Sequence, residues 1–453
     1  MKVLRTQVLS PLLLLCVTGS VLWAHPSGSV GDPLDGLQEE LECALLTSIL
    51  EAWYPRVVDA EQGGYWSQFD ADWKRLPDQP KMVVTQARHV WTSIRLYERF
   101  SERDELRQIA SHGVDYLLGT MWDSEKGGFF WLLDEQGNVL EQGRVGSRKQ
   151  SYGIAFAIYA LAAYHEVTGD ARALDGAVRT FRWLDSHAHD ARYGGYFDIM
   201  GANGAPYVNP ENRVYAKSQN TSIHLLEAFT ELFRVWPDEQ LRLRLVELQE
   251  LLMHRMIDAR GYVNQYFHED WTPVSFEHHA LDRYREVMHW DHVSFGHDVE
   301  IAYLLYESEL ALGGEKLPEI RQLGKKLLDH ALVHGWDAQN GGLYDAGLYR
   351  DGRMHLVSKH KAWWAQAELL NTLLMMHCFE PEDAHAYDQL ARRTWDYIST
   401  WLIDHERGGW YAQGLDQSPE AVNGLKSQIW KGAYHNSRAL LNASHWLECA
   451  EQR

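Results

Sequence analysis

Cysteine is scarce in this chain and basic residues are not in excess, and each of these absences excludes a class of protein. Four cysteines occur among 453 residues, and Cys43, Cys378 and Cys449 are the three beyond the first 24 residues. Their scatter matches neither a disulfide framework nor a zinc motif, so we expect a fold without disulfide staples and a site without metal. With 63 acidic and 43 basic residues, the formal net charge is −20. Such a charge disfavours nucleic acid and anionic membranes as partners.

Long apolar runs are also absent beyond the N-terminus, where residues 1–24 have the pattern of an export signal. Lys2 and Arg5 precede the apolar stretch from Pro11 to Val17, and Ala24 is the expected cleavage point. The pattern predicts a signal peptide over 1–24, a flexible segment over 25–36 and one folded domain over 37–453. We therefore expect an exported protein, periplasmic or secreted, whose mature form is a monomer or homodimer away from membranes. Leu22, two residues before Ala24, stands where a cleavage site normally has a small residue, so an uncleaved membrane anchor is the alternative.

Aromatic side chains and a repeated glycine pair are what the chain has in abundance. It contains 19 tryptophans and 22 tyrosines, which suit either a large core or the apolar faces of sugars. A glycine pair followed by aromatic or apolar residues recurs at 63–66, 127–131, 194–197, 341–344 and 408–411, and Gly261-Tyr262 is a degenerate sixth copy. A polar-faced helical pattern precedes each copy, and a more apolar one follows it.

This periodicity predicts twelve helices in six pairs. The polar-faced helices are expected over 37–54, 104–121, 170–186, 238–257, 315–334 and 383–403, and the apolar ones are expected to begin near Gln86, Ser151, Gln219, Gly296, Ala362 and Tyr434. Because a single helical pair cannot bury its apolar face alone, we predict an all-α (α/α)6 barrel with short β-hairpins at one rim. An open solenoid of helical pairs is the alternative.

The fourth repeat is longer than the others. From Gly261 to His297 is 36 residues, whereas the other repeats have 22 to 26 residues between the second glycine and a marker near the next helix start. The excess lies at about 276–290, just before the apolar helix. We interpret it as a lid or a wall of the binding site, and a surface excursion without a role is the alternative.

The candidate catalytic and ligand-binding residues lie at the starts of the apolar helices. If all six begin at one rim, their first turns meet in one bowl, and the residues are Arg88, Tyr152, Asn220 with His224, His297 with Glu300, Trp364 with Glu368, and Trp430 with His435. We add Trp131, which follows the second glycine pair. Such a bowl suits a neutral polyhydroxy ligand and proton transfer, because histidine exchanges protons at neutral pH and aromatic rings pack on sugars.

Four segments resemble the signatures of the N-acylglucosamine 2-epimerase and cellobiose 2-epimerase superfamily, and the wording is closest to the cellobiose branch. They are 217–228 (KSQNTSIHLLEA), 294–300 (SFGHDVE), 363–368 (WWAQAE) and 430–436 (WKGAYHN). The resemblance implies an (α/α)6 barrel and a cofactor-independent epimerisation at C2 of an aldose.

By this resemblance His297 and His435 are the acid and base on opposite faces of C2, and His224 helps to open the sugar ring. Arg88 is expected to bind the enediolate oxygens, and Glu300 and Glu368 to orient the histidines. Trp364 and Trp430 are expected to pack on the sugar, and Asn220 to bind its hydroxyls.

Several readings of the function remain open on the sequence alone. The substrate is either the reducing end of a β-1,4-linked disaccharide or free mannose or glucose, and the long 276–290 segment favours the free sugar by closing off space. The same enediolate protonated at C1 makes an aldose–ketose isomerase. A glycoside hydrolase using Glu300 and Glu368, and a sugar-binding protein without activity, are the alternatives of another class.

Overall fold

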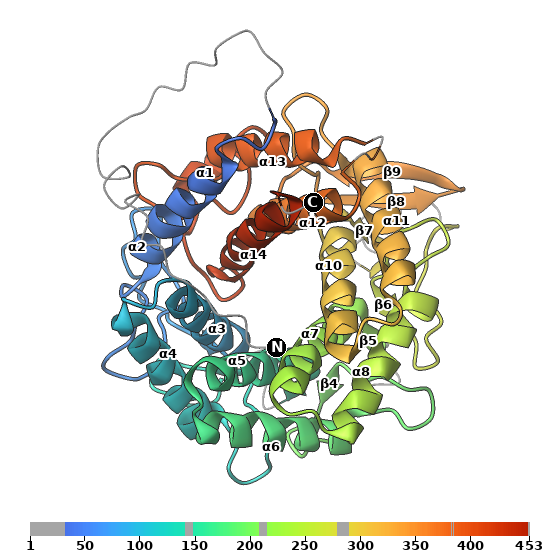
Figure 1. Ribbon diagram of the computed structural model, residues 1–453. Coiled ribbons are helices and arrows are strands. Elements are labelled where there is room, and N and C mark those ends of the chain that lie inside the picture. The colour runs from blue at the N-terminus through green and yellow to red at the C-terminus, as the bar shows by residue number, and fades with distance from the viewer. Residues whose placement is uncertain are drawn as a thin grey trace.

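The computed structural model describes residues 32–140, 148–207, 215–278, 290–381, 383 and 385–451. Within these residues an inner ring of helices lies inside an outer ring (Figure 1). The inner helices are α3 (Val83–Arg99), α5 (Ser151–Thr168), α7 (Gln219–Val235), α10 (Phe295–Leu312), α12 (Trp363–Phe379) and α14 (Tyr434–Glu451). The outer ones are α1 (Leu37–Ala44) continuing to α2 (Glu51–Trp53), α4 (Asp104–Tyr116), α6 (Ala171–Ala188), α8 (Glu239–Leu251), α11 (Leu317–Gly335) and α13 (Tyr387–Trp401). These bounds agree closely with the predicted ranges.

The two rings differ in how their side chains are buried. In α5 every residue from Ser151 to Tyr164 is buried, as expected for a helix that is covered on all sides. In α6 the buried residues form one stripe, which includes Ala173, Ala177, Phe181 and Leu184. The distribution of apolar residues around each helix in the sequence therefore distinguishes inner helices from outer ones.

The inner ring is closed. Each inner helix packs against the next along the chain, and α14 packs against both α3 and α1. At this seam Arg392 donates two hydrogen bonds of 2.9 Å to Glu40, and the amide of Phe69 donates to the carbonyl of Ser427 at 3.2 Å. The fold is thus an (α/α)6 barrel, and the open-solenoid alternative is wrong.

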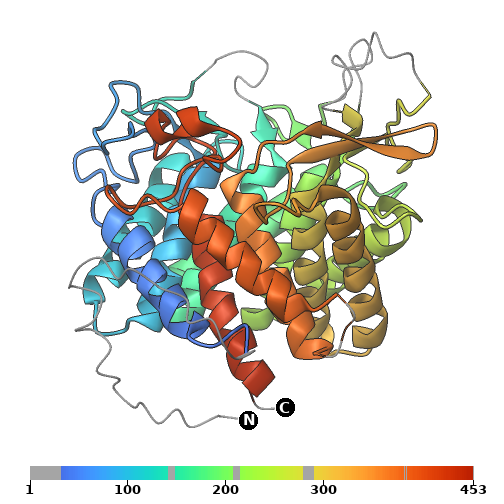
Figure 2. The same cartoon turned by 90° about the horizontal axis from the view of Figure 1, so that it is seen from above.

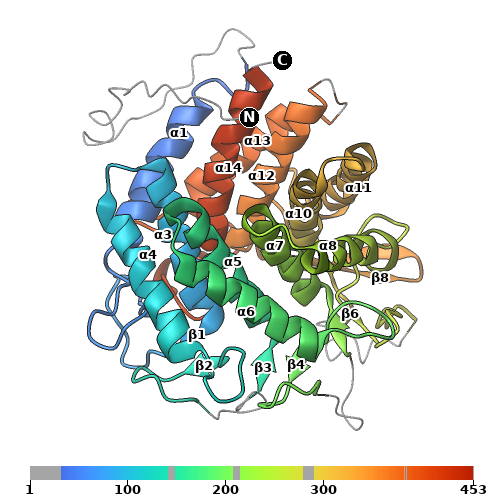
Figure 3. The same ribbon diagram turned by 60° about the horizontal axis from the view of Figure 1, so that its bottom comes forward.

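Short antiparallel strands lie along one end of the barrel (Figures 2 and 3). The pairs are β1 (Lys81–Met82) with β2 (Leu132–Leu133), β3 (Lys149–Gln150) with β4 (Ile199–Met200), and β5 (Lys217–Ser218) with β6 (Tyr266–Phe267). A three-stranded sheet is formed by β7 (Val293–Ser294), β8 (Ala346–Arg350) and β9 (Arg353–Ser358). In every pair between repeats, the strand just before an inner helix joins the strand of the next repeat, so the rim ties neighbouring repeats together.

Five repeats share a buried Asp–Lys contact that we name the Asp–Lys lock. Its aspartates are Asp59, Asp123, Asp190, Asp337 and Asp404, and the matching lysines are Lys81, Lys149, Lys217, Lys361 and Lys426. The Nζ to Oδ2 distances are 2.5 to 2.7 Å, and each lysine also donates to the carbonyl of the first glycine of its pair. Gly64 shows why glycine is needed: it has φ of 70°, and a Cβ there would lie 2.4 Å from Gln86 Oε1.

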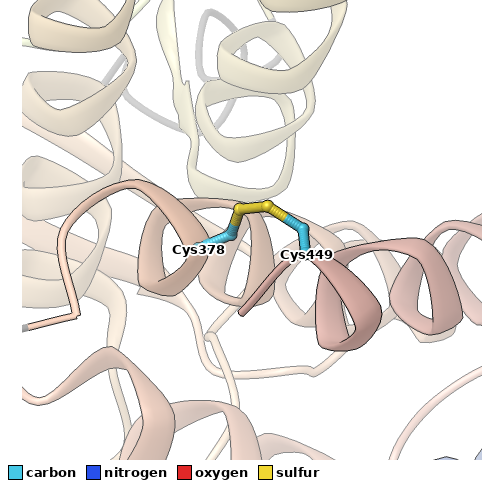
Figure 4. The surroundings of a disulfide bond; sticks show 2 residues. All are labelled: Cys378 and Cys449. Atoms are coloured by element: carbon cyan, nitrogen blue, oxygen red, sulfur yellow. A yellow bond between two sulfur atoms is a disulfide. The ribbon is translucent and has the colours of Figure 1, made fainter. Parts of the chain in front are cut away.

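A disulfide joins Cys378 near the end of α12 to Cys449 near the end of α14 (Figure 4). The expectation of a fold without disulfides is therefore wrong. The two cysteines are 71 residues apart, and the packing of α12 against α14, two successive inner helices, brings them together.

Two of the sequence predictions fall largely outside the described residues. The predicted signal, 1–24, lies there entirely, and so do residues 279–289 of the long fourth-repeat segment. Among the described helices, none combines the length and apolarity needed to cross a membrane.

Candidate active site

The predicted site residues lie at the starts of the inner helices, at the barrel end that carries the strands. Arg88, Tyr152, Asn220, His224, His297, Glu300, Trp364, Glu368 and His435 all fall within the first two turns of their helices. Local caps place some of them: the Ser218 side chain accepts from the amide of Thr221 and so starts α7 just before Asn220. Trp430 lies in the turn before α14 and Trp131 next to β2.

One wall of the site surrounds His224. Its ring lies 5.2 Å from that of Tyr152 and 4.7 Å from that of Phe156, measured between centroids. Arg88 donates to the Tyr152 hydroxyl at 3.1 Å, and its guanidinium lies over the Phe156 ring at 4.3 Å. A cation thus faces the bowl next to an imidazole, where it is able to stabilise a developing oxyanion.

The other two histidines both lie beside one indole, that of Trp364. Trp364 has its ring centroid 4.8 Å from that of His297 and 5.6 Å from that of His435. Nδ1 of His435 hydrogen-bonds Glu368 at 2.7 Å, which leaves Nε2 for a ligand. Nδ1 of His297 is buried and has no hydrogen-bond partner in the described structure. The two imidazoles therefore face one region from different helices, with nitrogen atoms available for proton transfer.

Arg438, which the sequence analysis missed, joins the carboxylates behind the histidines. Its Nη2 donates to Glu300 and Glu368 at 2.6 Å each, and its Nη1 donates to Glu227 and to the Tyr434 hydroxyl. Glu227 in turn hydrogen-bonds Nδ1 of His224 at 2.9 Å. One guanidinium thus orients carboxylates from three helices, and two of these carboxylates, Glu227 and Glu368, hydrogen-bond a histidine.

Part of this network was within reach of sequence reasoning. Glu227 follows His224 by three residues, the same spacing that singled out His297 and Glu300. In the structure Glu300 lies 3.8 Å from Nδ1 of His435 and hydrogen-bonds Arg438. Glu300, which was predicted to orient His297, thus also interacts with His435 and Arg438 of α14.

Burial disfavours the charged form of both candidate histidines. It lowers the pKa of His297 to about 3, with a smaller opposing effect of Glu300, and it lowers the pKa of His435 well below its ordinary value. Burial also raises the pKa of the Glu368 carboxyl despite Arg438. For Glu227, burial acts upward, but Arg438 and His224 together hold the pKa at about 2. The unprotonated imidazoles are ready to accept a proton at neutral pH.

Glu300, Glu368 and His435 place three ligand atoms within 4.8 Å of one another, a spacing that a metal ion could use. The Arg438 guanidinium, however, bonds both carboxylates directly. The positive charge that these carboxylates require is therefore supplied by the chain itself.

The remaining predicted contacts line the mouth. Trp430 has 46% of its surface exposed, and its ring lies 6.0 Å from Trp131 and 6.3 Å from Tyr152. Asn220 is partly exposed at the start of α7. His89, by contrast, is fully enclosed, and its Nδ1 contacts the Tyr54 hydroxyl at 3.1 Å, so it belongs to the core.

Fold and site together define an (α/α)6-barrel protein with a histidine acid–base centre. The sequence profile of the N-acylglucosamine 2-epimerase (GlcNAc 2-epimerase) family matches residues 63–439, and the chain belongs to this family. It is 30% identical to the cellobiose 2-epimerase of Bacteroides fragilis over 417 residues, 89% of this chain and 97% of the relative. It is 24% identical to the D-mannose isomerase of Marinomonas mediterranea over 394 residues, 85% of this chain and 92% of the relative.

A solved structure, that of cellobiose 2-epimerase from Spirochaeta thermophila, superimposes with a TM-score of 0.79 at 29% identity and covers 93% of this chain and 99% of its own. The chain is thus an enzyme of the isomerase class, a sugar epimerase, and its partner is a small sugar.

Proposed function

We propose that the protein epimerises C2 of an aldose without a cofactor and interconverts the glucose and mannose configurations. The preferred substrate is the reducing end of a β-1,4-linked disaccharide such as cellobiose or mannobiose, and free mannose or glucose is the next choice. The observation that carries the proposal is the pair of buried imidazoles, His297 and His435, that both lie beside the Trp364 indole. Inversion at one carbon requires a base on one face and an acid on the other.

The residues of the site can carry out each proton transfer that this reaction requires. One histidine removes the C2 proton, the electron pair forms the C1–C2 double bond, and negative charge develops on O1. Arg88 binds this enediolate, and His224 with Glu227 transfers the proton needed to open the ring and to hold O1. The other histidine must enter this step in its protonated form, and it returns its proton to the opposite face of C2 and is left neutral. Trp364 and Trp430 pack on the sugar, with Trp131 and Tyr152 behind them and Asn220 at the hydroxyls.

A second candidate is the aldose–ketose isomerisation of mannose to fructose, in which the same enediolate is protonated at C1. The similarity to a D-mannose isomerase favours it, and an N-acylglucosamine 2-epimerase is the variant that the family description favours. Glycoside hydrolysis is disfavoured, because Glu300 and Glu368 share one nitrogen of Arg438 and have that guanidinium between them.

The test is proton NMR of the protein in D₂O with cellobiose, mannobiose, mannose, glucose and N-acetylglucosamine. Growth of the C2 epimer with deuterium at C2 is the expected result, and the fastest sugar identifies the substrate. Ketose formation supports the isomerase, whereas cleavage of the glycosidic bond or no reaction with any sugar overturns the proposal.

We also propose that the protein is exported and that residues 1–24 are removed. The basic residues and apolar run at the N-terminus support this, and so does the disulfide, since disulfides persist mainly in oxidising compartments. The intact mass of protein recovered from the periplasm or medium tests it. A mass that includes Met1 to Ala24 contradicts cleavage.

A further inference from the structure

A groove outside the active site opens beside β5 and β6. Its volume is about 290 Å³, and it is lined by Tyr193, Tyr215, Ala216, His268, Glu269 and Asp270. None of these residues belongs to the catalytic bowl. They come from the third glycine-pair turn, from the segment leading into β5 and from the turn after β6.

The lining combines the two chemistries that bind sugars. Tyr193 has 36% of its surface exposed, and Tyr215 lies partly exposed next to it in the groove. Aromatic rings of this kind offer flat apolar faces to pyranose rings. The imidazole of His268 and the carboxylates of Glu269 and Asp270 add polar groups that suit hydroxyls.

The groove is held rigidly from below. Lys217 donates to Asp190 at 2.7 Å, to the Gly194 carbonyl at 2.8 Å and to the Glu269 carbonyl at 2.8 Å. The Trp271 indole donates to the Tyr193 carbonyl at 3.0 Å. These bonds join the two turns that form the groove, so a ligand meets a surface that is already ordered, and binding costs less conformational entropy.

An aromatic cluster connects the groove to the bowl. The Tyr215 ring lies 4.4 Å from that of Tyr266 and 5.3 Å from that of Trp290. Tyr215 is five residues ahead of Asn220, so their Cα atoms are at most about 17 Å apart. Trp290 is seven residues ahead of His297. The groove and the bowl therefore lie on the same rim of the barrel, within reach of one oligosaccharide.

We propose that the groove is a second carbohydrate-binding site, which takes the distal sugars of a β-1,4-linked oligosaccharide whose reducing end occupies the bowl. This inference rests on the proposed function for the reducing end, and what it adds is a binding site for the distal sugars outside the bowl. The groove contributes binding and takes no part in the chemistry at C2.

The test compares cellobiose with cellopentaose in the full protein and in Tyr193→Ala. Loss of one stacked ring is expected to raise KM for cellopentaose about five- to tenfold, with kcat unchanged. The constants for cellobiose change less than about twofold, because a disaccharide does not reach the groove. Tyr207→Ala is the matched control, since Tyr207 has 41% of its surface exposed and does not line the groove.

Equal constants for Tyr193→Ala and the unaltered protein on cellopentaose overturn the inference, and so does an equal loss on both sugars. Calorimetric titration with cellopentaose separates this result from a failure of the proposed function. If no sugar is epimerised but Tyr193→Ala still weakens cellopentaose binding and Tyr207→Ala does not, the groove stands as a sugar site. If epimerisation is found but neither binding nor KM responds to Tyr193→Ala, only the groove is refuted.

Discussion

The fourth repeat differs from the other five in how its inner helix is anchored. In the five, the Asp–Lys lock holds the glycine turn, and in four of them the lysine stands two residues before the inner helix. In the fourth, that place is taken by Val293, and the aspartate of the turn, Asp258, is bound by its neighbour Arg260 at 2.9 Å. The repeat without the lock is also the one that supplies His297.

A second anchor occurs in two of the repeats and is absent from the fourth. The fourth residue of α3 is Gln86 and that of α12 is Gln366, and each amide bonds both the N–H and the carbonyl of one residue after the glycine pair. The fourth residue of α10 is Asp298, which accepts only from the Val263 amide, at 2.9 Å. The comparison teaches that the fourth repeat, which supplies His297, keeps the helical pair of the other repeats but neither of these two anchors.

The largest effect is expected from the histidine of the altered repeat and from its partner. His297→Asn and His435→Asn each remove one base, and we expect kcat to fall about 10²- to 10⁴-fold. Deuterium incorporation at C2 measures the loss. His254→Asn is the control, because His254 is exposed on the outer side and pairs only with Glu250. Activity retained in either variant contradicts the two-base mechanism.

Next in size is the cost of breaking an Asp–Lys lock. Lys81→Met leaves Asp59 buried without its cation, and the free energy of unfolding is expected to fall by about 3–5 kcal/mol, measured by urea denaturation. The double variant Lys81→Met/Asp59→Asn should recover most of the loss.

The matched change in the fourth repeat is Val293→Met. It removes no charge, and the larger side chain is expected to cost about 1–3 kcal/mol through over-packing. An equal loss for Lys81→Met and Val293→Met contradicts the distinction between the repeats.

A smaller effect is expected at Asp298, whose pKa is raised by burial to about 6. Because the folded state binds this proton more tightly than the unfolded state, the stabilisation is complete below about pH 4 and is lost as the pH rises through 6. Asp298→Asn cannot titrate, so the variant should gain about 2–3 kcal/mol relative to the parent between pH 4 and pH 7. Urea denaturation at both pH values measures this difference. The same difference at both values contradicts the assignment.

The smallest expected effect is the change of kcat/KM as the pH falls below neutrality. Burial lowers the pKa of His297 to about 3; Glu300 acts against this, and His292, His224 and His435 add to it. The base form therefore persists as the pH falls, and kcat/KM should vary less than about tenfold between pH 7.5 and 5. A midpoint near 6.5, the value of an exposed histidine, contradicts this environment for His297.

Most of the barrel could be predicted because the sequence repeats the same pattern of glycine pairs and helices six times. The glycine pairs mark the turns, and the change from one apolar stripe to apolar all round marks inner helices, so Ser151, Gln219 and Tyr434 were located as helix starts. The Asp–Lys lock was also visible in principle, since an aspartate stands four residues before the first glycine of each of the five pairs.

What could not be predicted depends on the closed ring. Arg438 meets Glu227 across 211 residues of sequence and Glu300 across 138, and no local pattern specifies such a meeting. The Cys378–Cys449 pair joins the ends of two neighbouring inner helices, and no local sequence pattern specifies it either. These contacts depend on which helices are neighbours around the circle, and helical periodicity fixes only which face is buried.

The seam between the first and last repeats has a consequence for synthesis. A ribosome makes Glu40 and Phe69 more than 350 residues before Arg392 and Ser427, their partners across the seam. Repeats that emerge early pack on one another but leave an open edge, and the circle closes only when α14 is complete. Helix α14 also carries His435, Arg438 and Cys449. A chain that stops before α14 therefore cannot close the ring, form the disulfide or complete the catalytic site. Function is thus acquired in the last step of folding.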